Sequence, residues 1–90
     1  MYSVVVTNRF EKEVKLAAKR GKKLEKLKSV MQVLAAGEPL PPRSRDHTLV
    51  GNFVGRRECH IEPDWLLIYK LDNTTKTIIF ERTGTHADLF

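Results

Sequence analysis

The sequence predicts a single α+β domain, residues 1–90, in which a helical hairpin covers one face of an antiparallel sheet. A β-branched segment opens the chain, two apolar stripes with helical spacing follow it, and strand-like segments separated by turn residues make up the rest. The order β-α-α-β-β-β is typical of an α+β fold. Ninety residues, of which 41% are hydrophobic, are enough for one modest core.

The first half of the chain is expected to hold one strand and two helices. Tyr2–Thr7 is β-branched and extended, and Asn8 with Glu11 three places later resembles a capping box that opens a helix. The apolar stripes of the two helices are Phe10, Val14, Ala17 and Ala18, then Leu24, Leu27, Met31 and Leu34. Gly21 separates the helices and Gly37 ends the second one, because glycine readily adopts the left-handed conformation of helix ends.

The second half is expected to be mostly strand. Prolines in the segment 38–46 exclude a helix there, and Thr48–Val50 is a short extended segment. Further strands are predicted at 56–62, 65–71 and 77–82, with turn residues at 62–64 and 72–75.

Strand alternation predicts which side chains share a face. In the segment 56–62, one face is expected to carry Arg56, Glu58, His60 and Glu62, and the other Arg57, Cys59 and Ile61. In the last strand, Ile78, Phe80 and Arg82 are expected to point the same way as one another. If these two strands lie near each other, Arg82 approaches His60, and the residues after it bring His86 and Phe90 over the sheet.

The net charge of +5 is unevenly distributed. Residues 9–28 hold nine basic and three acidic side chains, whereas the rest of the chain is close to neutral. Such a cationic segment is typical of a surface that meets a polyanion or an acidic partner, and equally of a solvated helix face. Charge alone leaves both interpretations open.

Composition and spacing exclude several classes of protein. The longest apolar run, Trp65–Tyr69, is too short to cross a bilayer, so we expect no membrane partner. The N-terminal segment lacks the basic region of a signal peptide, and Cys59 is the only cysteine, which fits a reducing cytoplasm. Cys59 and His60 are adjacent and face opposite ways on a strand, and no C-x-x-C or H-x-x-x-H pattern is present. We therefore expect no metal and no cofactor.

Three histidines, His47, His60 and His86, lie in the second half of the chain. An imidazole has an unperturbed pKa of about 6.5, so it accepts and donates protons near neutral pH. Cleavage of RNA needs a base that removes the 2′-hydroxyl proton and an acid that protonates the departing 5′ oxygen. Imidazoles combined with a carboxylate and a guanidinium therefore suggest a small ribonuclease.

Three motifs carry a resemblance to a known family. They are Asp46-His47-x-Leu49-x-Gly51, Arg57-Glu58-Cys59-His60-Ile61-x-Pro63-Asp64-Trp65-Leu66-Leu67-Ile68-Tyr69 and Arg82-Thr83-Gly84-Thr85-His86-x-Asp88-Leu89-Phe90. In this order they resemble the YafQ-like toxins of the RelE/ParE superfamily, from bacterial type II toxin–antitoxin systems, over nearly the whole chain. The resemblance implies a RelE-like fold and a metal-independent endoribonuclease that cuts mRNA, typically on the translating ribosome. It also implies a cognate antitoxin that covers the active face.

The functional residues that the resemblance implies are His47, His60, Asp64, Trp65, Arg82, His86 and Phe90. We expect His60, with Asp64 nearby, and His86 to transfer protons, and either imidazole can be the acid. Arg82 is expected to stabilise the charge of the phosphorane, because a guanidinium binds two phosphate oxygens and keeps its proton.

Three residues of this set are expected to bind RNA. Trp65 and Phe90 offer flat faces for unstacked bases, and His47 is expected to contact RNA or to tune the other imidazoles. Structural roles stay open for five residues of the whole set: His60 as a surface histidine, Asp64 as a turn residue, Trp65 as a core residue, Phe90 as a core plug, and Arg82 in a surface ion pair with Glu58 or Glu81.

Two other functions are alternatives to the ribonuclease. One is a ParE-like inhibitor of DNA gyrase, which has the same fold and needs no acid–base residues. The other is a non-catalytic module that binds RNA or the ribosome through the cationic segment. The histidines together with Arg82 favour the ribonuclease, because the gyrase inhibitor has no use for them.

Overall fold

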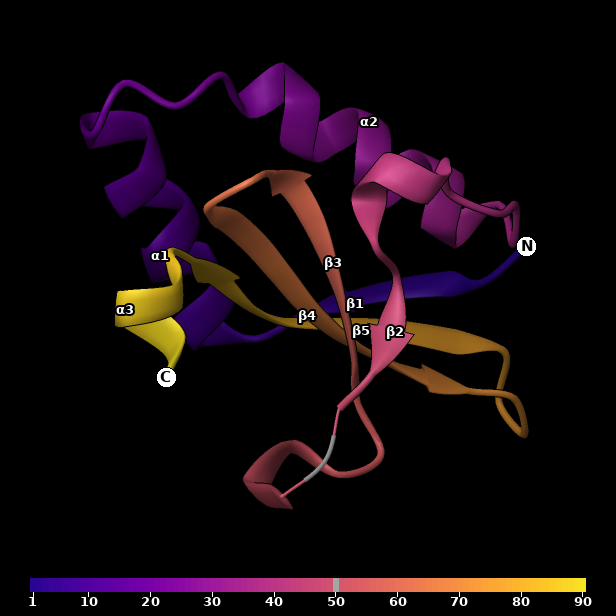
Figure 1. Ribbon diagram of the computed structural model, residues 1–90. Coiled ribbons are helices and arrows are strands. Elements are labelled where there is room, and N and C mark those ends of the chain that lie inside the picture. The colour runs from indigo at the N-terminus through magenta and orange to yellow at the C-terminus, as the bar shows by residue number, and fades with distance from the viewer. Residues whose placement is uncertain (50) are drawn as a thin grey trace.

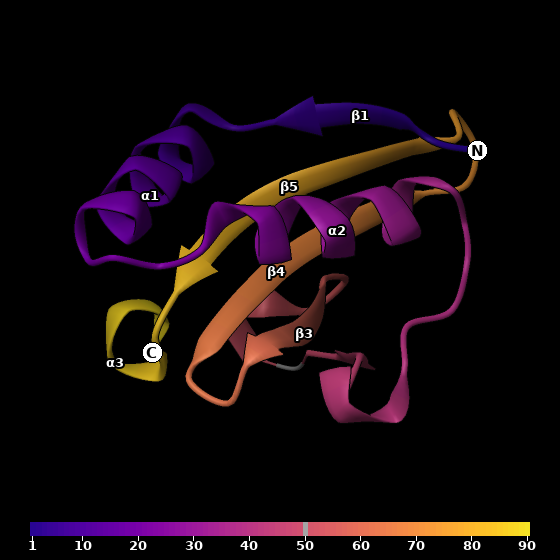
Figure 2. The ribbon, with the colours of Figure 1, turned by 90° about the horizontal axis from the view of Figure 1, so that it is seen from above.

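In the computed structural model, which describes residues 1–49 and 51–90, two helices cover one face of a five-stranded sheet (Figures 1 and 2). The strands are β1 (Ser3–Val6), β2 (His47–Thr48), β3 (Arg57–Glu62), β4 (Trp65–Asp72) and β5 (Thr77–Gly84). The helices are α1 (Asn8–Lys19), α2 (Leu24–Ala35) and α3 (His86–Leu89), with short 3₁₀ turns at Pro42–Ser44 and Gly51–Phe53. The predicted α+β class and element order are confirmed, although Val50 of the expected segment 48–50 lies outside the described residues. No helix in the described ranges is long and apolar enough to cross a bilayer.

The sheet is mixed and not antiparallel throughout. Its strand order is β1-β5-β4-β3-β2, where β1 runs parallel to β5 and the other neighbouring pairs are antiparallel. A parallel pair needs a long crossover, and here both helices and the other strands lie between β1 and β5 in the chain. Side chains alternate between the two faces in the same way in parallel and in antiparallel strands, so the sequence pattern does not reveal that β1 and β5 are parallel.

The helix side of the sheet carries the main hydrophobic core. Its buried members are Phe10, Ala17, Leu27, Leu34, Cys59, Trp65, Leu67, Tyr69, Ile78 and Phe80. The indole N–H of Trp65 donates to Oγ1 of Thr83, whose hydroxyl donates to the carbonyl of Leu66, so these buried polar groups are satisfied. On the opposite face, Leu66 and Ile68 pack with Leu89 of α3 in a smaller cluster.

The first helix begins one residue away from the predicted cap. Thr7, and not Asn8, is the N-cap residue, because its Oγ1 accepts a hydrogen bond from the N–H of Phe10 at 3.0 Å. The Thr7 hydroxyl also lies 3.1 Å from the carbonyl oxygen of Glu81, to which it donates. The Thr7 side chain therefore caps the N-terminus of α1 and links it to β5 by a hydrogen bond.

A register shift in β5 separates Arg82 from the residues expected to share its face. Phe80 pairs with Tyr69 and Arg82 pairs with Ile68, so Glu81 is an extra residue in β5. Phe80 and Tyr69 face the helix-side core, whereas Ile68 belongs to the cluster on the opposite face. The prediction that Arg82 points the same way as Phe80 was wrong, because a β-bulge reverses the alternation beyond it.

A second shift, in β3, separates Glu62 from His60. His60 pairs with Leu66, but Glu62 pairs with Trp65, whose side chain lies in the helix-side core. The Glu62 carboxylate consequently accepts hydrogen bonds from lysines of the helix layer. The predicted common face therefore holds for Glu58 and His60, and the prediction for Glu62 was wrong.

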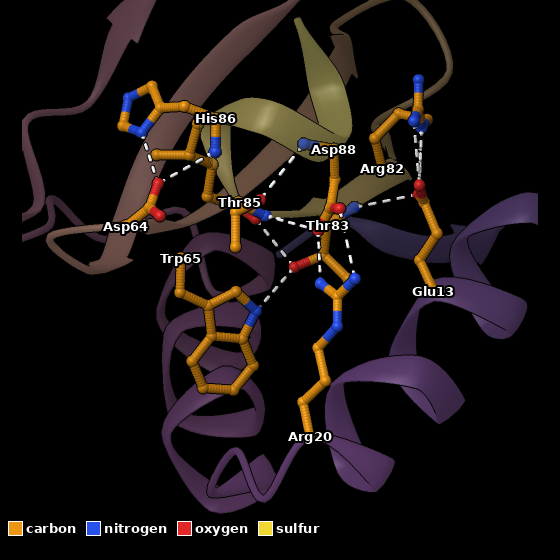
Figure 3. Close-up of polar contacts among 10 residues, drawn as sticks. Glu13, Arg20, Asp64, Trp65, Arg82, Thr83, Thr85, His86 and Asp88 are labelled. Atoms are coloured by element: carbon orange, nitrogen blue, oxygen red, sulfur yellow. Dashed lines mark hydrogen bonds and ion pairs between the residues drawn. The ribbon is translucent and has the colours of Figure 1, made fainter.

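Contacts from several elements hold the start of α3 (Figure 3). Thr85 and Asp88 form a capping box, in which each side chain accepts a hydrogen bond from the backbone N–H of the other. Arg20, just after α1, forms a salt bridge with Asp88 at 2.6 Å. Gly84 leaves room for this contact, since a Cβ at that position would lie 2.9 Å from Oδ2 of Asp88. The end of α1, the end of β5 and α3 therefore form one unit that fixes the position of His86.

We expect Asp88→Asn to lower the free energy of unfolding by about 0.5–1 kcal/mol near pH 6, because it removes the charge that pairs with Arg20. The Arg20 guanidinium, together with the N–H of Thr85, lowers the pKa of Asp88 to about 2. Folding lowers the pKa of this carboxyl group, so its ionised form stabilises the native state fully at pH values above the unfolded pKa of about 3.9. This stabilisation is lost as the pH falls through the pKa of the folded state. The difference between wild type and variant should therefore shrink between about pH 4 and about pH 2.

Urea unfolding at a series of pH values measures this difference. Glu38→Gln is the matched control, because Glu38 is an exposed carboxylate outside α3 and its contacts. The control should differ little from wild type at every pH. An Asp88→Asn difference that stays constant down to the acid limit would contradict the role of the Arg20 pair.

Candidate active site

Two imidazoles meet where β3 faces α3. His60 lies on β3, and His86 is the first residue of α3. Their ring centroids are 5.7 Å apart, with the ring planes tilted by 60°. The side chain of His60 is 13% exposed and that of His86 is 55% exposed, so a substrate can reach the pair from the His86 side. The prediction that the residues after Arg82 bring His86 over the sheet is confirmed.

Asp64, in the turn between β3 and β4, fixes the ring of His86 (Figure 3). Its Oδ1 accepts hydrogen bonds from the backbone N–H and from Nδ1 of His86, at 2.9 and 2.6 Å. The bonds from the His86 backbone and ring lower the pKa of Asp64, which is therefore ionised near neutral pH. Because a carboxylate oxygen only accepts, Nδ1 carries a proton, and Nε2 is the nitrogen left for a substrate.

A buried carboxylate, that of Glu58, lies close to the imidazoles of His47 and His60. Its Oε1 lies 3.5 Å from Nε2 of His47 and 3.7 Å from Nε2 of His60. The Glu58 side chain is 6% exposed, and its Oε2 has no hydrogen-bond partner among the described residues. A protonated imidazole at either position would give this buried charge an opposite charge. Strand alternation places Glu58 on the face of His60, but the sequence predicts no catalytic role for it.

His47 belongs to the same cluster as His60. It pairs with Glu58 across β2 and β3, and its Nδ1 lies 2.5 Å from the carbonyl oxygen of Arg45. A carbonyl oxygen only accepts, so Nδ1 of His47 donates and Nε2 faces Glu58. The structure therefore brings together four of the predicted site residues, His47, His60, His86 and Asp64, with Glu58 as a second carboxylate.

Arg82 does not join the imidazoles in this structure. Its Nε and Nη2 donate to the carboxylate of Glu13 on α1, at distances of 2.9 to 3.0 Å. Glu13 also accepts a hydrogen bond from the backbone N–H of Thr83 at 3.2 Å. Figure 3 shows the Arg82 guanidinium and the His86 ring on opposite sides of α3. Arg82 thus forms an ion pair, but its partner is Glu13 and not Glu58 or Glu81. Alternation along the strands does not predict contacts with a helix.

Trp65 and Phe90 differ, although both were expected to stack on bases. Trp65 is 1% exposed in the core, so its predicted stacking role was wrong and its structural interpretation holds. The hydrophobic run that follows Trp65 was the signal for this burial. Phe90 is 62% exposed, and its ring packs edge-on against Phe53 with centroids 5.5 Å apart. Phe90 is therefore accessible to RNA.

The structure also bears on a cysteine nucleophile and on a metal site. Burial, with added repulsion from nearby carboxylates, raises the pKa of Cys59 to about 12, so its thiol is not a nucleophile near neutral pH. Within residues 1–49 and 51–90, no group of three or more His, Cys, Asp or Glu is arranged to hold a metal ion.

Comparison with known proteins gives matches over nearly the whole chain. Residues 2–90 match the family described as bacterial toxin of type II toxin-antitoxin system, YafQ. The chain is 52% identical over 85 residues to the mRNA interferase toxin YafQ of Escherichia coli K12, which covers 93% of this chain and 90% of that protein.

Solved structures agree with this match. YafQ in the E. coli DinJ–YafQ complex has a TM-score of 0.91 and 47% identity, covering 100% of this chain and 99% of that chain. A metal-bound toxin from Helicobacter pylori has a TM-score of 0.93 and 37% identity, covering 100% of both chains. The chain therefore belongs to the YafQ family of bacterial type II toxin–antitoxin toxins.

Proposed function

We propose that this chain is a metal-independent endoribonuclease toxin that cleaves mRNA on translating ribosomes in the cytoplasm. The observation that carries the proposal is the pair of imidazoles, His60 and His86, 5.7 Å apart, with Asp64 bound to one of them. The name of the 52% identical E. coli relative, an mRNA interferase toxin, supports the substrate class.

The reaction uses the nucleophile that RNA itself carries. One imidazole removes the 2′-hydroxyl proton, and the 2′ oxygen attacks the adjacent phosphorus. As this bond forms, the bond to the 5′ oxygen breaks, and the second imidazole gives that oxygen a proton. The products are a 2′,3′-cyclic phosphate and a 5′-hydroxyl end. The geometry of His60 and His86 is compatible with either assignment of acid and base.

The two carboxylates act through the imidazoles. Asp64 keeps Nδ1 of His86 protonated and leaves Nε2 for the substrate. Glu58 faces Nε2 of both His47 and His60, so an imidazolium formed at either position during the reaction has an opposite charge beside it. His47, the third imidazole, contacts RNA or tunes its neighbours, and the exposed ring of Phe90 is available for a base.

The charge of the phosphorane needs a cation, and Arg82 fills this role only after leaving Glu13. In the structure, Glu13 neutralises the guanidinium and both side chains are about seven-eighths buried, with 13% and 15% exposed. A phosphate that binds Arg82 must therefore compete with the Glu13 carboxylate. On this account Glu13 sets how readily Arg82 reaches the substrate.

A cognate antitoxin is the expected protein partner. The E. coli relative has been solved in a DinJ–YafQ toxin–antitoxin complex. We infer that this chain has an equivalent partner, which covers the imidazole cluster and keeps mRNA out. Such a partner explains how a cell tolerates a nuclease directed at its own messages.

We expect His60→Ala and His86→Ala each to lower the rate of mRNA cleavage by roughly 10²–10⁴-fold, the usual contribution of a general acid or base. The measurement is the appearance of cut ends on messages translated with purified components and purified toxin. Circular dichroism and thermal unfolding confirm that each variant is folded. Wild-type rates from a folded His60→Ala, His86→Ala double variant would refute the proposed site.

A separate comparison tests whether Arg82 acts on the phosphate or only clamps α1 to β5. If it acts on the phosphate, Arg82→Gln should lower kcat by roughly 10²-fold, as for loss of one transition-state donor. Glu13→Gln should leave kcat unchanged or raise it, because the guanidinium is then free. Both variants should lower stability. Equal, small losses of kcat in the two variants would show that Arg82 is only a clamp.

A further inference from the structure

A hollow of about 700 Å³ opens beside His60. It lies between α2, the loop that carries the 3₁₀ turn Pro42–Ser44, and the last residues of β3. Figure 2 shows this loop leaving the end of α2 and returning towards β3. Sites for small ligands commonly measure roughly 300–1,000 Å³, so a nucleotide fits here. Apart from His60, the residues of this hollow have no part in the mechanism above.

The charge of the hollow favours an anion. Lys26 of α2 and the loop residues Arg43 and Arg45 line it. Glu62 also lines it, but its carboxylate is paired with Lys26 at 2.9 Å and with Lys22 at 3.3 Å. In the part of the chain that the structure describes, no carboxylate forms an ion pair with Arg43 or Arg45. Two positive charges are therefore available to a ligand.

The wall of the hollow formed by α2 and β3 is largely apolar. Val30, Val33, Leu40 and Ile61 line it, and each is partly buried. Unstacked bases of single-stranded RNA stack on aromatic side chains or on guanidinium planes, and a base held in a pocket also packs against apolar side chains, whereas phosphates bind arginine. An apolar wall with two available guanidinium groups therefore suits one nucleotide of a single strand.

The hollow is continuous with the imidazole cluster. His60 belongs to both, and the carbonyl of Arg45 binds Nδ1 of His47. A phosphodiester placed at His60 and His86 therefore has its neighbouring nucleotide at the mouth of the hollow. We propose that this hollow binds the nucleotide next to the scissile linkage, an inference that rests on the proposed function. The base lies on the apolar wall, and its phosphate lies on Arg43 and Arg45.

This subsite would determine which bases flank the cut. Ser29, exposed on α2, lines the hollow, whereas Gln32 is exposed one turn further along the same helix and does not line it. Ser29→Phe therefore fills the hollow without entering the core, and Gln32→Phe adds the same bulk outside it. Arg43→Gln removes one charge from the exposed loop and serves as a second, independent variant.

The probe for binding is a short single-stranded RNA with 2′-O-methyl groups, which lacks the nucleophile and is not cut. We expect Ser29→Phe and Arg43→Gln each to raise its Kd on the order of tenfold, by fluorescence anisotropy, the scale of losing one stacked base or one phosphate contact. Ser29→Phe should also change the distribution of bases next to mapped cut sites. Gln32→Phe should match wild type in both measurements.

Unchanged RNA affinity and unchanged cut sites in a folded Ser29→Phe variant would overturn the subsite. Loss of antitoxin binding with RNA affinity intact would also overturn it, because the hollow would then belong to a protein partner. The binding measurement does not depend on catalysis. If His60→Ala and His86→Ala cut normally while Ser29→Phe weakens RNA binding, the catalytic proposal fails and the subsite stands.

Discussion

The arrangement of the candidate site depends on one carboxylate, that of Asp64. Its Oδ1 binds both the backbone N–H and the ring of His86, so the turn between β3 and β4 holds the start of α3 against β3. A helix of four residues is too short to be stable by its own hydrogen bonds. The capping box, the Arg20 salt bridge and Asp64 therefore hold α3 in place, and each of them helps to keep His86 next to His60.

Much of the fold followed from periodicity, and the exceptions have physical causes. Helical stripes and strand alternation depend on local burial, and they predicted the fold class and the element order up to β5, while Gly21 and Gly37 marked the C-terminal ends of α1 and α2. The N-cap of α1 was predicted one residue too late, and α3 was not predicted. The alternation failed at Glu81 and near Glu62, because a bulge inserts one residue that leaves no mark in the hydrophobic pattern. The parallel pairing of β1 was missed because strand direction does not affect which residues are buried.

The residues implied by the family resemblance separate into two groups in space. His47, His60, His86 and Asp64 converge, whereas the buried Trp65 and the Arg82 guanidinium, paired with Glu13, lie apart from them, and Phe90 is exposed at the end of α3. Trp65 binds Thr83, and the neighbouring Arg82 binds Glu13, so both stabilise the strand that leads into α3. A motif in a sequence does not distinguish a residue that reacts from one that positions it, because both are needed for the same geometry.

The charges of the cluster connect RNA binding with the chemistry. Glu58 and Asp64 place two carboxylates beside three imidazoles, so the cluster repels a phosphodiester when all the imidazoles are neutral. The general acid must carry a proton before the reaction, and that proton also offsets part of the repulsion. Arg82 is neutralised by Glu13, whereas Arg43 and Arg45 line the hollow beside His60 and form no ion pair with a carboxylate among the described residues. Substrate binding and proton transfer are therefore coupled through the protonation of the same imidazoles.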